Sequence, residues 1–484
     1  STMFLRKMAK RHENYASFLK PIQKMRKLGY NERIVRRVTS LSKEITADQT
    51  ARYQQALAAD PTAKVLERAV SHQGILATSA DYASETDMTP VFSIDLDTGK
   101  VANQKQSGRC WMFAALNTMR HHLADLFNLS DFELSQNYTN FWDKFEKANY
   151  FYENVLATAD QPTSSRKVAF LMATPQQDGG QWDMLCAIIE KYGIVPKSVM
   201  PETYNSSKSS ELNSTLNLKL RKDAVTLRQL VADKTSDADI ATAKDKMLGE
   251  VYRLLSFSLG EPVSEFDFEY RDDDKNYHID KGLTPKSFFD KYVDWDLTDY
   301  VSIINAPTAD KPYNHTYTVE MLGNVVNGRQ VKHLNVTMKD FKALAIKQLQ
   351  AGQSVWFGCD VGQSSERQKG IMDTKFYDKD ALFNIDFSTT KAQRLDYGES
   401  MMTHAMVLTG VDLVDGQPTK WKVENSWGEK VGTKGYFVMS DAWMDEYCYQ
   451  VVVNKQFLPD DLKKTQETEA PTVLAPWDPM GALA

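Results

Sequence analysis

Several features are scarce in this sequence of 484 residues. It has only four cysteines, which lie far apart, and no two of them form a CxxC pair. This spacing argues against a zinc site and against a secreted scaffold held by disulfides. No run of eighteen apolar residues occurs, and the N-terminus lacks the basic, apolar and small-residue order of a secretory signal. We therefore expect a cytoplasmic protein with reduced thiols, no membrane span, no metal and no other cofactor.

An overall excess of positive charge is also missing. The formal net charge is −6, whereas proteins that bind nucleic acid usually carry a basic surplus, so nucleic acid is not the expected partner. The exception is residues 1–43, which hold twelve Lys or Arg side chains against Glu13 and Glu32. A basic N-terminal extension over residues 1–47 could contact RNA, an anionic lipid or an acidic neighbour, or be only peripheral. A nucleic-acid-binding protein is therefore kept as an alternative function.

The first half of the chain has helical patterns. Residues 48–71 read as a helix that is interrupted at Asp60 and Pro61. After Cys110, apolar residues recur at spacings of three and four, as on one face of a helix. They are Met112, Ala115, Leu116, Met119, Leu123 and Phe127. Cys110 is thus expected in the first turn of a helix, and further helices are expected over residues 133–159 and up to Gly193.

The second half has mainly strand patterns. Residues 404–414, 420–428 and 435–440 are short β segments separated by Gly-containing turns, and a helix over residues 337–352 precedes a buried strand. Residues 90–101 alternate as a half-buried strand does. The polar and acidic stretch 204–308 reads as an inserted, mainly helical unit. We predict an α+β fold in which a helical half faces a β half.

The position of Cys110 suggests a chemical role. A thiol is a useful nucleophile only as thiolate, and a helix N-terminus places N–H groups and partial positive charge near the sulfur. An adjacent imidazolium would lower the cysteine pKa further, to roughly 3.5–7.5. Sequence alone therefore predicts a lowered pKa for Cys110.

The matching imidazole should come from a separate, rigid element. His404 fits best, because it begins the apolar run HAMVLTG and Asn425 lies on a neighbouring predicted strand, where its side-chain oxygen could accept from the ring N–H. His121 and His122 lie on the cysteine helix itself, two turns and more beyond the thiol. We expect Cys110, His404 and Asn425 to act together.

Four ordered segments then carry a family resemblance. NQKQSGRCWMF, DGG, HAMVLTG and ENSWG resemble the papain-like cysteine peptidases, and the bleomycin hydrolase and aminopeptidase C branch more closely than papain. The resemblance extends from about residue 48 to 484. It implies a papain-like fold with a large, mainly helical insertion, and a cysteine-type aminopeptidase.

The resemblance also implies a role for individual residues. Cys110 would be the nucleophile, His404 the general base and acid, Asn425 the residue that orients the ring, and Gln104 an oxyanion-hole amide. Substrate-binding positions would be Asp178, Gly179, Gly180, Trp427 and Ala484, with Trp427 shielding the bond between His404 and Asn425. An acyltransferase or another amide hydrolase would use the same catalytic groups, and this alternative stays open.

Two departures from papain stand out. Cysteine and histidine are 294 residues apart, against about 130–150 in papain-like enzymes, and the inserted unit accounts for the excess. Ser107 stands where papain has a disulfide cysteine, which suits a reducing compartment.

The branch resemblance extends to the end of the chain and to assembly. The last residues would form an arm in the active-site cleft, with the carboxylate of Ala484 meeting the α-ammonium of a peptide with a free N-terminus. A homohexamer is also implied. The predicted divisions are listed here in order: extension 1–47, left half 48–203, insertion 204–308, right half 309–470 and arm 471–484.

Overall fold

The computed structural model describes residues 44–483, and the chain divides into two compact units between Thr78 and Ser79. The described part of the first unit contains α3 (Ala47–Ala59), α4 (Ala63–Gln73) and most of α5 (Ile75–Ser79). Helix α3 begins with a reciprocal capping box between Thr46 and Gln49. The predicted interruption at Asp60 and Pro61 is confirmed. The basic stretch 1–43 and Ala484 lie outside the described residues.

The second unit contains the remaining helices. They are α6 (Tyr82–Asp87), α7 (Cys110–Phe127), α8 (Gln136–Ala157), α9 (Arg166–Ala173), α10 (Trp182–Tyr192), α11 (Tyr204–Ser207), α12 (Ser210–Ala232), α13 (Asp237–Leu259), α14 (Pro285–Phe288), α15 (Met338–Gln350), α16 (Lys379–Phe383), α17 (Lys391–Tyr397), α18 (Asp441–Tyr447) and α19 (Asp460–Thr468), with short helical segments η1 (Phe289–Val293), η2 (Leu297–Asp299), η3 (Lys455–Phe457) and η4 (Pro479–Gly481). The helices that we expected after Cys110, after residue 133 and up to Gly193 are α7, α8 and α10.

A large mixed sheet forms the other half of this unit. Its strands run in the order β14-β5-β6-β4-β13-β7-β10-β11-β12-β9-β8, and β1 pairs with β10 beside this path. Their bounds are β1 (Ile94–Asp95), β4 (Tyr300–Ile304), β5 (His315–Val319), β6 (His333–Asn335), β7 (Val355–Cys359), β8 (Ser365–Glu366), β9 (Ile371–Met372), β10 (His404–Val414), β11 (Gln417–Glu424), β12 (Tyr436–Ser440), β13 (Cys448–Asn454) and β14 (Thr472–Leu474). The strands β10, β11 and β12 are antiparallel neighbours, as their sequence patterns predict.

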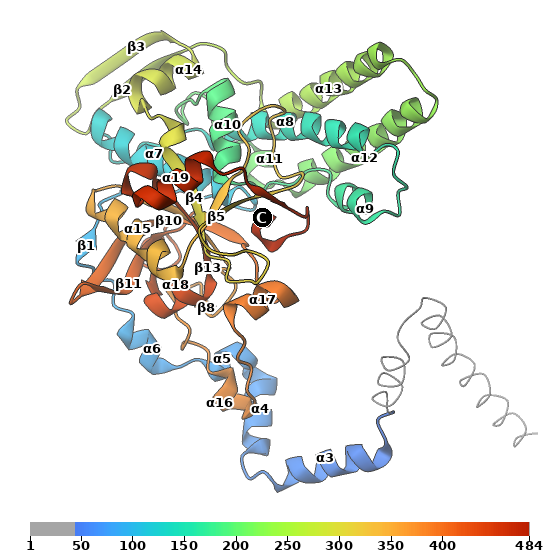
Figure 1. Ribbon diagram of the computed structural model, residues 1–484. Coiled ribbons are helices and arrows are strands. Elements are labelled where there is room, and N and C mark those ends of the chain that lie inside the picture. Colours follow the sequence, from blue (N-terminus) through green and yellow to red (C-terminus); the bar gives the residue numbers. More distant parts are fainter. Residues whose placement is uncertain (1–43, 484) are drawn as a thin grey trace, which may run out of the picture. The chain divides into compact units, whose positions relative to one another are not determined.

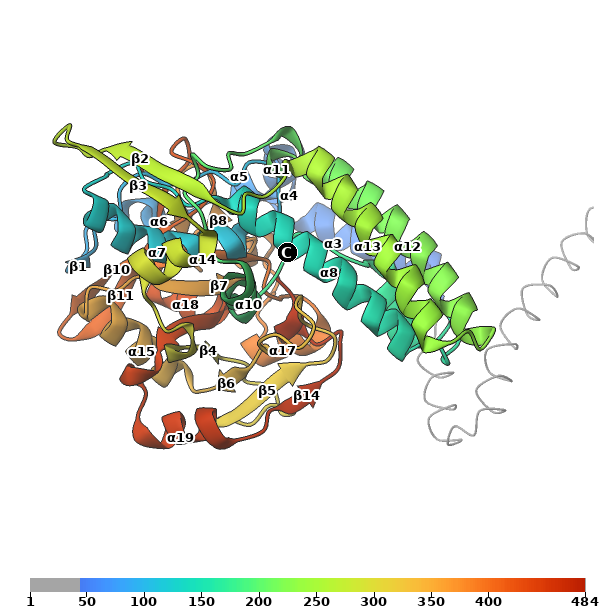
Figure 2. The ribbon, with the colours of Figure 1, turned by 90° about the horizontal axis from the view of Figure 1, so that it is seen from above.

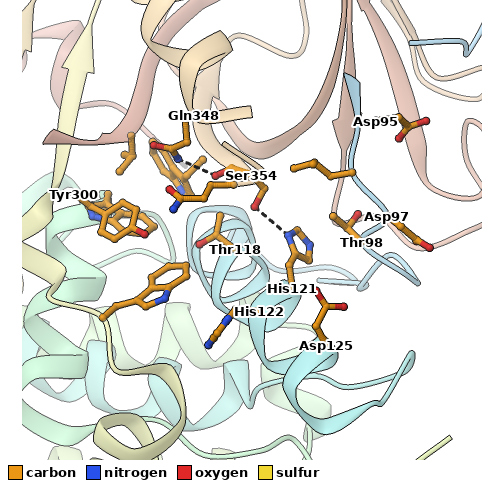
Figure 3. A pocket seen from close by; sticks show the side chains of 17 residues that line it. Asp95, Asp97, Thr98, Thr118, His121, His122, Asp125, Tyr300, Gln348 and Ser354 are labelled. Carbon is orange, nitrogen blue, oxygen red and sulfur yellow. Dashed lines mark hydrogen bonds between the residues drawn. The ribbon is translucent and has the colours of Figure 1, made fainter. Parts of the chain in front are cut away.

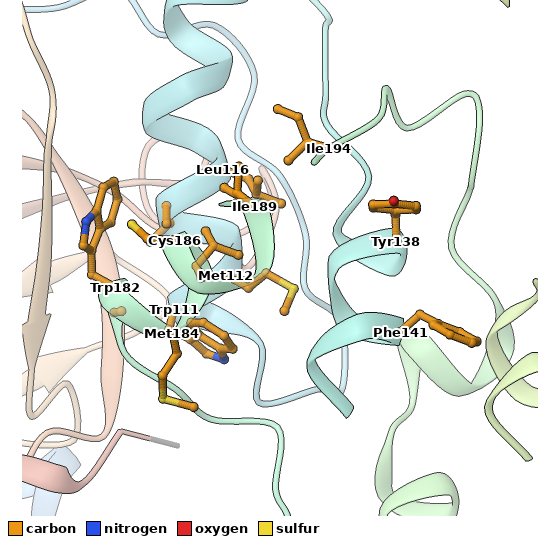
Figure 4. Close-up of a cluster of buried hydrophobic side chains, with 14 of the residues drawn as sticks. Trp111, Met112, Leu116, Tyr138, Phe141, Trp182, Met184, Cys186, Ile189 and Ile194 are labelled. Carbon is orange, nitrogen blue, oxygen red and sulfur yellow. The ribbon is translucent and has the colours of Figure 1, made fainter. Parts of the chain in front are cut away.

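Helix α7 packs on the sheet at β10 and β7 and, on its other side, on α8 and α10 (Figure 1). Its side chains are buried nearly all round in the first three turns, which is unusual for a helix on a surface and typical of a central one. In Figure 4, Trp111, Met112 and Leu116 of α7 face Trp182, Cys186 and Ile189 of α10. Burial on both sides holds the first turn of α7, and with it Cys110, at a defined place.

Three long helices form a layer beside this core. Figures 1 and 2 show α8, α12 and α13 side by side along most of their length. Helix α12 buries Leu212, Leu216 and Leu220 at spacings of four, while most of its exposed residues are polar or charged. The one-sided pattern explains why this inserted segment forms helices that pack on α8.

Two local predictions differ from the structure. The acidic stretch near residue 270 forms a β-hairpin of β2 (Phe266–Arg271) and β3 (Tyr277–Leu283), in which Phe266 and Phe268 are buried and the charged residues between them are exposed. The predicted strand over residues 90–101 pairs only at Ile94 and Asp95. A side chain at Gly410 would lie 2.5 Å from the carbonyl oxygen of Ile94, so glycine permits this approach.

Among residues 44–483, no helix combines the length and the apolar character that crossing a bilayer requires. The predicted division of the chain at residues 47, 203, 308 and 470 stays a prediction.

Candidate active site

The sulfur of Cys110 lies at the junction of helix and sheet. Helix α7 begins at this residue, and the backbone N–H of Ala405, the second residue of β10, lies close enough to Sγ to lower the pKa of the thiol. The backbone N–H groups of Cys110 and Trp111, at the helix N-terminus, act on the sulfur in the same direction. The thiol and the residue next to His404 therefore lie near each other, on the same side of the molecule.

The ring of His404 is held on two sides. Its Nε2 lies 2.8 Å from Oδ1 of Asn425, and the backbone N–H of Ser426 donates to the same oxygen at 2.7 Å. Because Oδ1 accepts, Nε2 carries the proton and Nδ1 is the nitrogen left for a thiol. The indole of Trp427 stacks on the imidazole at 4.8 Å, and the guanidinium of Arg367 lies 3.8 Å from the indole centroid.

Burial dominates the protonation of this pair. It raises the pKa of the Cys110 thiol to about 11 and lowers the pKa of His404 to about 4, although the Asn425 bond raises the latter. The lowered cysteine pKa that the sequence predicts is thus not found, because dehydration of the sulfur outweighs the N–H groups around it. Burial thus favours the neutral thiol and the neutral imidazole over the charged forms.

Gln104 lies in the loop that leads to Cys110. Its backbone N–H donates to the carbonyl of Ser426 at 2.8 Å, and its side-chain oxygen accepts from the hydroxyl of Ser426 at 2.5 Å. Its amide nitrogen donates to the carbonyl of Ser107 at 2.5 Å, which leaves one N–H of the amide. Lys105, with φ 55°, has the left-handed backbone that is costly for a side-chain-bearing residue and recurs at functional sites.

Buried charges hold the same loop from the helical side. The Arg109 guanidinium, 1 % exposed, donates to both carboxylate oxygens of Glu202, at 2.8 and 3.2 Å, and to the hydroxyl of Ser107. A forked pair of this kind fixes both position and orientation. It therefore restrains the residue that precedes Cys110.

Asp178 is a hub of this loop. Its carboxylate accepts from the backbone N–H of Gly108 at 2.8 Å, from the buried ammonium of Lys144 at 2.8 Å and from the hydroxyl of Ser209 at 2.5 Å. Burial alone would raise the pKa of Asp178, but Lys144 and these donors outweigh it and hold the pKa far below its usual range. The side chain thus orders the approach to Cys110.

Gly179 and Gly180 follow directly and lie against the cysteine helix. A side chain at Gly180 would come within 2.7 Å of the Trp111 ring, so only glycine lets this backbone lie on the indole. The ammonium of Lys147 donates to the carbonyl of Gly179 at 2.5 Å. The two glycines line a cavity of about 260 Å³ together with Gly481 and Leu483.

A second cavity, of about 420 Å³, lies farther along α7 (Figure 3). His121 and His122 line it, together with aromatic side chains that include Trp295 and Tyr300. His121 bonds Ser354 and Glu424 rather than any residue near the thiol. This arrangement agrees with the exclusion of His121 and His122 from the cysteine site.

Of the residues predicted for the site, those outside the arm lie around the start of α7, and Gly481 and Leu483 of the arm line the cavity beside Gly179 and Gly180. Ala484 lies outside the described residues. Sequence reasoning missed Arg109, Lys144, Arg367 and Glu424. A charged residue directly before Cys110, or directly before Asn425, was the available signal, since long charged side chains are rarely buried unless they are paired.

Comparison with known proteins decides the family. The model of the Peptidase C1-like family matches residues 44–481. The chain belongs to the Peptidase C1-like family. It is 59 % identical over 446 residues to an aminopeptidase C of Lactobacillus helveticus, covering 92 % of this chain and 99 % of that relative. With an aminopeptidase C of Streptococcus thermophilus the identity is 57 % over 448 residues, covering 92 % and 100 %.

A solved structure supports the same family. PepW from Lactobacillus rhamnosis HN001 superimposes with a TM-score of 0.90 at 72 % identity, covering 92 % of this chain and 100 % of that one. Together these findings confirm the resemblance to the aminopeptidase C branch, the papain-like α+β fold and the prediction of a cysteine-type aminopeptidase.

The ion pair beneath the cysteine loop generates a prediction. Asp178→Asn leaves the Lys144 ammonium buried without its counter-charge, and we expect the free energy of unfolding at pH 7 to fall by about 3–5 kcal/mol. The carboxyl binds its proton more weakly in the folded than in the unfolded chain. Its contribution is therefore fully present above the unfolded pKa, about 4, and is lost progressively as pH falls below that value toward the lower pKa of the folded chain. Urea unfolding at pH 7 and below pH 4 measures the difference in the free energy of unfolding between the wild type and Asp178→Asn. This difference should be smaller in acid.

Asp183→Asn is the matched control for this prediction. Burial raises the pKa of Asp183 to about 6, against the opposing charge of Arg329. A carboxyl with a raised folded pKa contributes stability below about pH 4 and loses that contribution as pH rises through 6. Between pH 7 and pH 4, the loss of unfolding free energy relative to the wild type should shrink in Asp178→Asn and grow in Asp183→Asn. The same trend in both variants would contradict the assignment of these charges.

Proposed function

We propose that this protein releases N-terminal residues from peptides through a thiol acyl-enzyme, with Cys110 as nucleophile, His404 as general base and acid, and Asn425 as the residue that orients the ring. One observation carries the proposal: the sulfur of Cys110 lies beside the backbone N–H of Ala405, while the ring of the preceding residue, His404, is bonded through Nε2 to Asn425. This leaves Nδ1 of His404 as the base for the thiol proton.

The chemistry follows from neutral partners. Burial opposes either charge alone, but transfer of the thiol proton to Nδ1 forms thiolate and imidazolium together, and their attraction offsets the cost of dehydration. The thiolate adds to the scissile carbonyl, and the imidazolium returns the proton to the leaving amine. Water then adds to the thioester, His404 takes its proton, and the thiol is released with the free acid.

The oxyanion that forms in each addition needs donors. The backbone N–H of Cys110 and the remaining side-chain N–H of Gln104 are the proposed pair, and loss of one such donor typically reduces kcat roughly 100- to 1000-fold. The bonds of Gln104 to Ser107 and Ser426 hold its amide in place beforehand. Trp427 covers the bond between His404 and Asn425, and Gly179 and Gly180 offer backbone groups to an extended peptide.

The C-terminal arm is proposed to restrict the enzyme to free N-termini. The arm is well anchored: β14 pairs in parallel with β5, Asp478 bonds the buried ammonium of Lys311 at 2.9 Å, and Trp477 lies under the guanidinium of Arg166 at 3.8 Å. Leu483, 3 % exposed, and Gly481 line the cavity beside Gly179 and Gly180. These contacts support an arm that blocks the subsites before the scissile residue.

Assembly and location belong to the same proposal. The family resemblance implies a homohexamer, and we place it in the cytosol, where the four widely separated cysteines, Cys110, Cys186, Cys359 and Cys448, would stay reduced. Light scattering of the full chain at micromolar concentration tests the assembly. Acyl transfer to an amine in place of water would use the same groups, and product analysis with an added amine acceptor separates the two outcomes.

The nucleophile assignment gives a direct prediction. Cys110→Ala should lower kcat for an aminoacyl-fluorophore substrate by at least about 10⁴-fold, because no other group can form the acyl-enzyme. The fold should be retained, as seen by circular dichroism. Cys186→Ala is the control: this thiol is packed between α7 and α10 (Figure 4), so it should cost about 1 kcal/mol of stability and leave kcat unchanged. Undiminished turnover in Cys110→Ala would remove the cysteine from the mechanism.

The arm gives a second prediction. Deleting residues 481–484 should lower kcat/KM for substrates with a free N-terminus roughly 10- to 100-fold, the value of one charge-assisted hydrogen bond. The same deletion should create cleavage of N-blocked peptides, since the subsites before the scissile residue become open. Asp478→Asn weakens the ion pair with Lys311. It should lower cleavage of substrates with a free N-terminus and raise cleavage of N-blocked peptides, each by less than the deletion does. An unchanged preference for free amines would exclude the arm as the selective element.

A further inference from the structure

A buried carboxylate stands directly before the ring-orienting asparagine. Glu424, 1 % exposed, is the last residue of β11, and its side chain points into α7. Its Oε1 accepts from the guanidinium of Arg120 at 2.7 Å and from the amide of Asn117 at 3.1 Å, and its Oε2 lies 2.9 Å from Nε2 of His121. Three side chains of α7 thus bond one carboxylate at the end of β11.

The geometry of α7 gives these contacts a direct relation to the thiol. Asn117 and His121 lie seven and eleven residues after Cys110, which places all three on one face of the helix, with about 1.5 Å of rise per residue. Rotation or sliding of α7 at the level of Glu424 would therefore displace Sγ of Cys110 as well. Arg120 also donates to the carbonyl oxygens of Lys100 and Thr98, so the helix position is fixed from a third segment.

Asn425 depends on its backbone for its position. Its side-chain oxygen accepts from His404 and from Ser426, but its Nδ2 is buried and has no hydrogen-bond partner among the described residues. An amide without a partner for its N–H groups is not held by its own donors. The backbone on either side is held instead, by Gln104 at Ser426 and by the side chain of Glu424.

We infer that Glu424 is a positioning residue, which sets the register between the helix of Cys110 and the strand that ends at Asn425, and thereby the alignment of thiol, imidazole and amide. The inference rests on the proposed roles of these three residues. Glu424 does not contact the reacting groups, and it acts through the two elements that carry them.

The charges around Glu424 are suited to this task. Burial alone would raise its pKa, but His121 and Arg120 outweigh burial and keep it lowered, so the carboxylate is ionised at pH 7. As an ionised group it accepts only, and it therefore matches the three donors on α7. His121 completes the arrangement by bonding Ser354 at 3.0 Å through Nδ1 (Figure 3). A glutamine has one acceptor oxygen and one amide NH2 group, so it would face at least one of these donors with a donor of its own.

Glu424→Gln tests the inference in the full chain. We expect kcat to fall roughly 10- to 100-fold with KM changed less than about threefold, because a misaligned catalytic group affects the chemical step rather than binding. Because the Asn425 bond raises the pKa of His404, the limb of the kcat/KM profile that belongs to His404 should move toward lower pH. Unaltered kcat at temperatures well below the melting temperature would overturn the inference.

Two further variants separate alignment from stability. Asp223→Asn removes a carboxylate of equal burial, which bonds Tyr152 and Lys219 within the α12 layer, and it should lower the melting temperature without lowering kcat. Arg120→Met combined with Glu424→Leu removes both charges, so folding should be retained while kcat stays low. Equal loss of kcat in Asp223→Asn, or full activity of the double variant, would show that Glu424 is merely structural.

Measurement of Cys110→Ala beside these variants distinguishes the proposed role of Cys110 from the positioning role of Glu424. If it retains turnover, the proposed function fails regardless of Glu424. If it is inactive while Glu424→Gln matches the wild type, only the positioning role fails.

Discussion

The close approach of the Ala405 N–H to the sulfur of Cys110 is the constraint on which the rest of the site depends. It joins the first turn of a central helix to the first residues of a buried strand, elements that lie almost three hundred residues apart in the sequence. A nucleophile and its base can work together only if both elements are held within a fraction of an ångström. The surrounding core and ion pairs serve this alignment.

The restraints come from several directions. Contact between Trp111 and Gly180 packs α7 against the segment that precedes α10. The ion pair of Arg109 and Glu202 holds the loop before the cysteine. The carboxylate of Asp178 accepts hydrogen bonds from Gly108 and Lys144. Buried charges add little net stability compared with apolar packing, but they specify one arrangement because an unpaired partner is costly. This specificity is most useful in an active site, where water is excluded and the reacting groups have to be aligned. Dehydration also explains why thiol and imidazole are neutral before proton transfer.

Local structure was largely predictable from the sequence, and long-range charge pairing was not. The stripe after Cys110, the stop at Gly193 and the apolar run HAMVLTG each depend on neighbours in the chain, so α7, α10 and β10 follow from local sequence patterns and capping. The hairpin β2–β3 was missed because its acidic residues conceal the alternation of Phe266, Phe268 and Tyr270. Arg109 pairs with Glu202, 93 positions away, and Glu424 pairs with Arg120, about 300 positions away. No local sequence pattern predicts either pair. The roles of Cys110, His404 and Asn425 came from motifs in a shared order, and remain a proposal.

Selective alkylation tests the central claim most directly. The full chain is treated with a small excess of iodoacetamide near pH 6, and modified cysteines are identified by mass spectrometry while residual activity is followed. Because the proposed proton transfer from Cys110 to His404 forms a reactive thiolate, we expect carbamidomethylation at Cys110 before the other three cysteines, in proportion to lost activity, with much slower reaction in His404→Ala. Activity that survives complete modification of Cys110, or an equal alkylation rate in His404→Ala, would contradict the account.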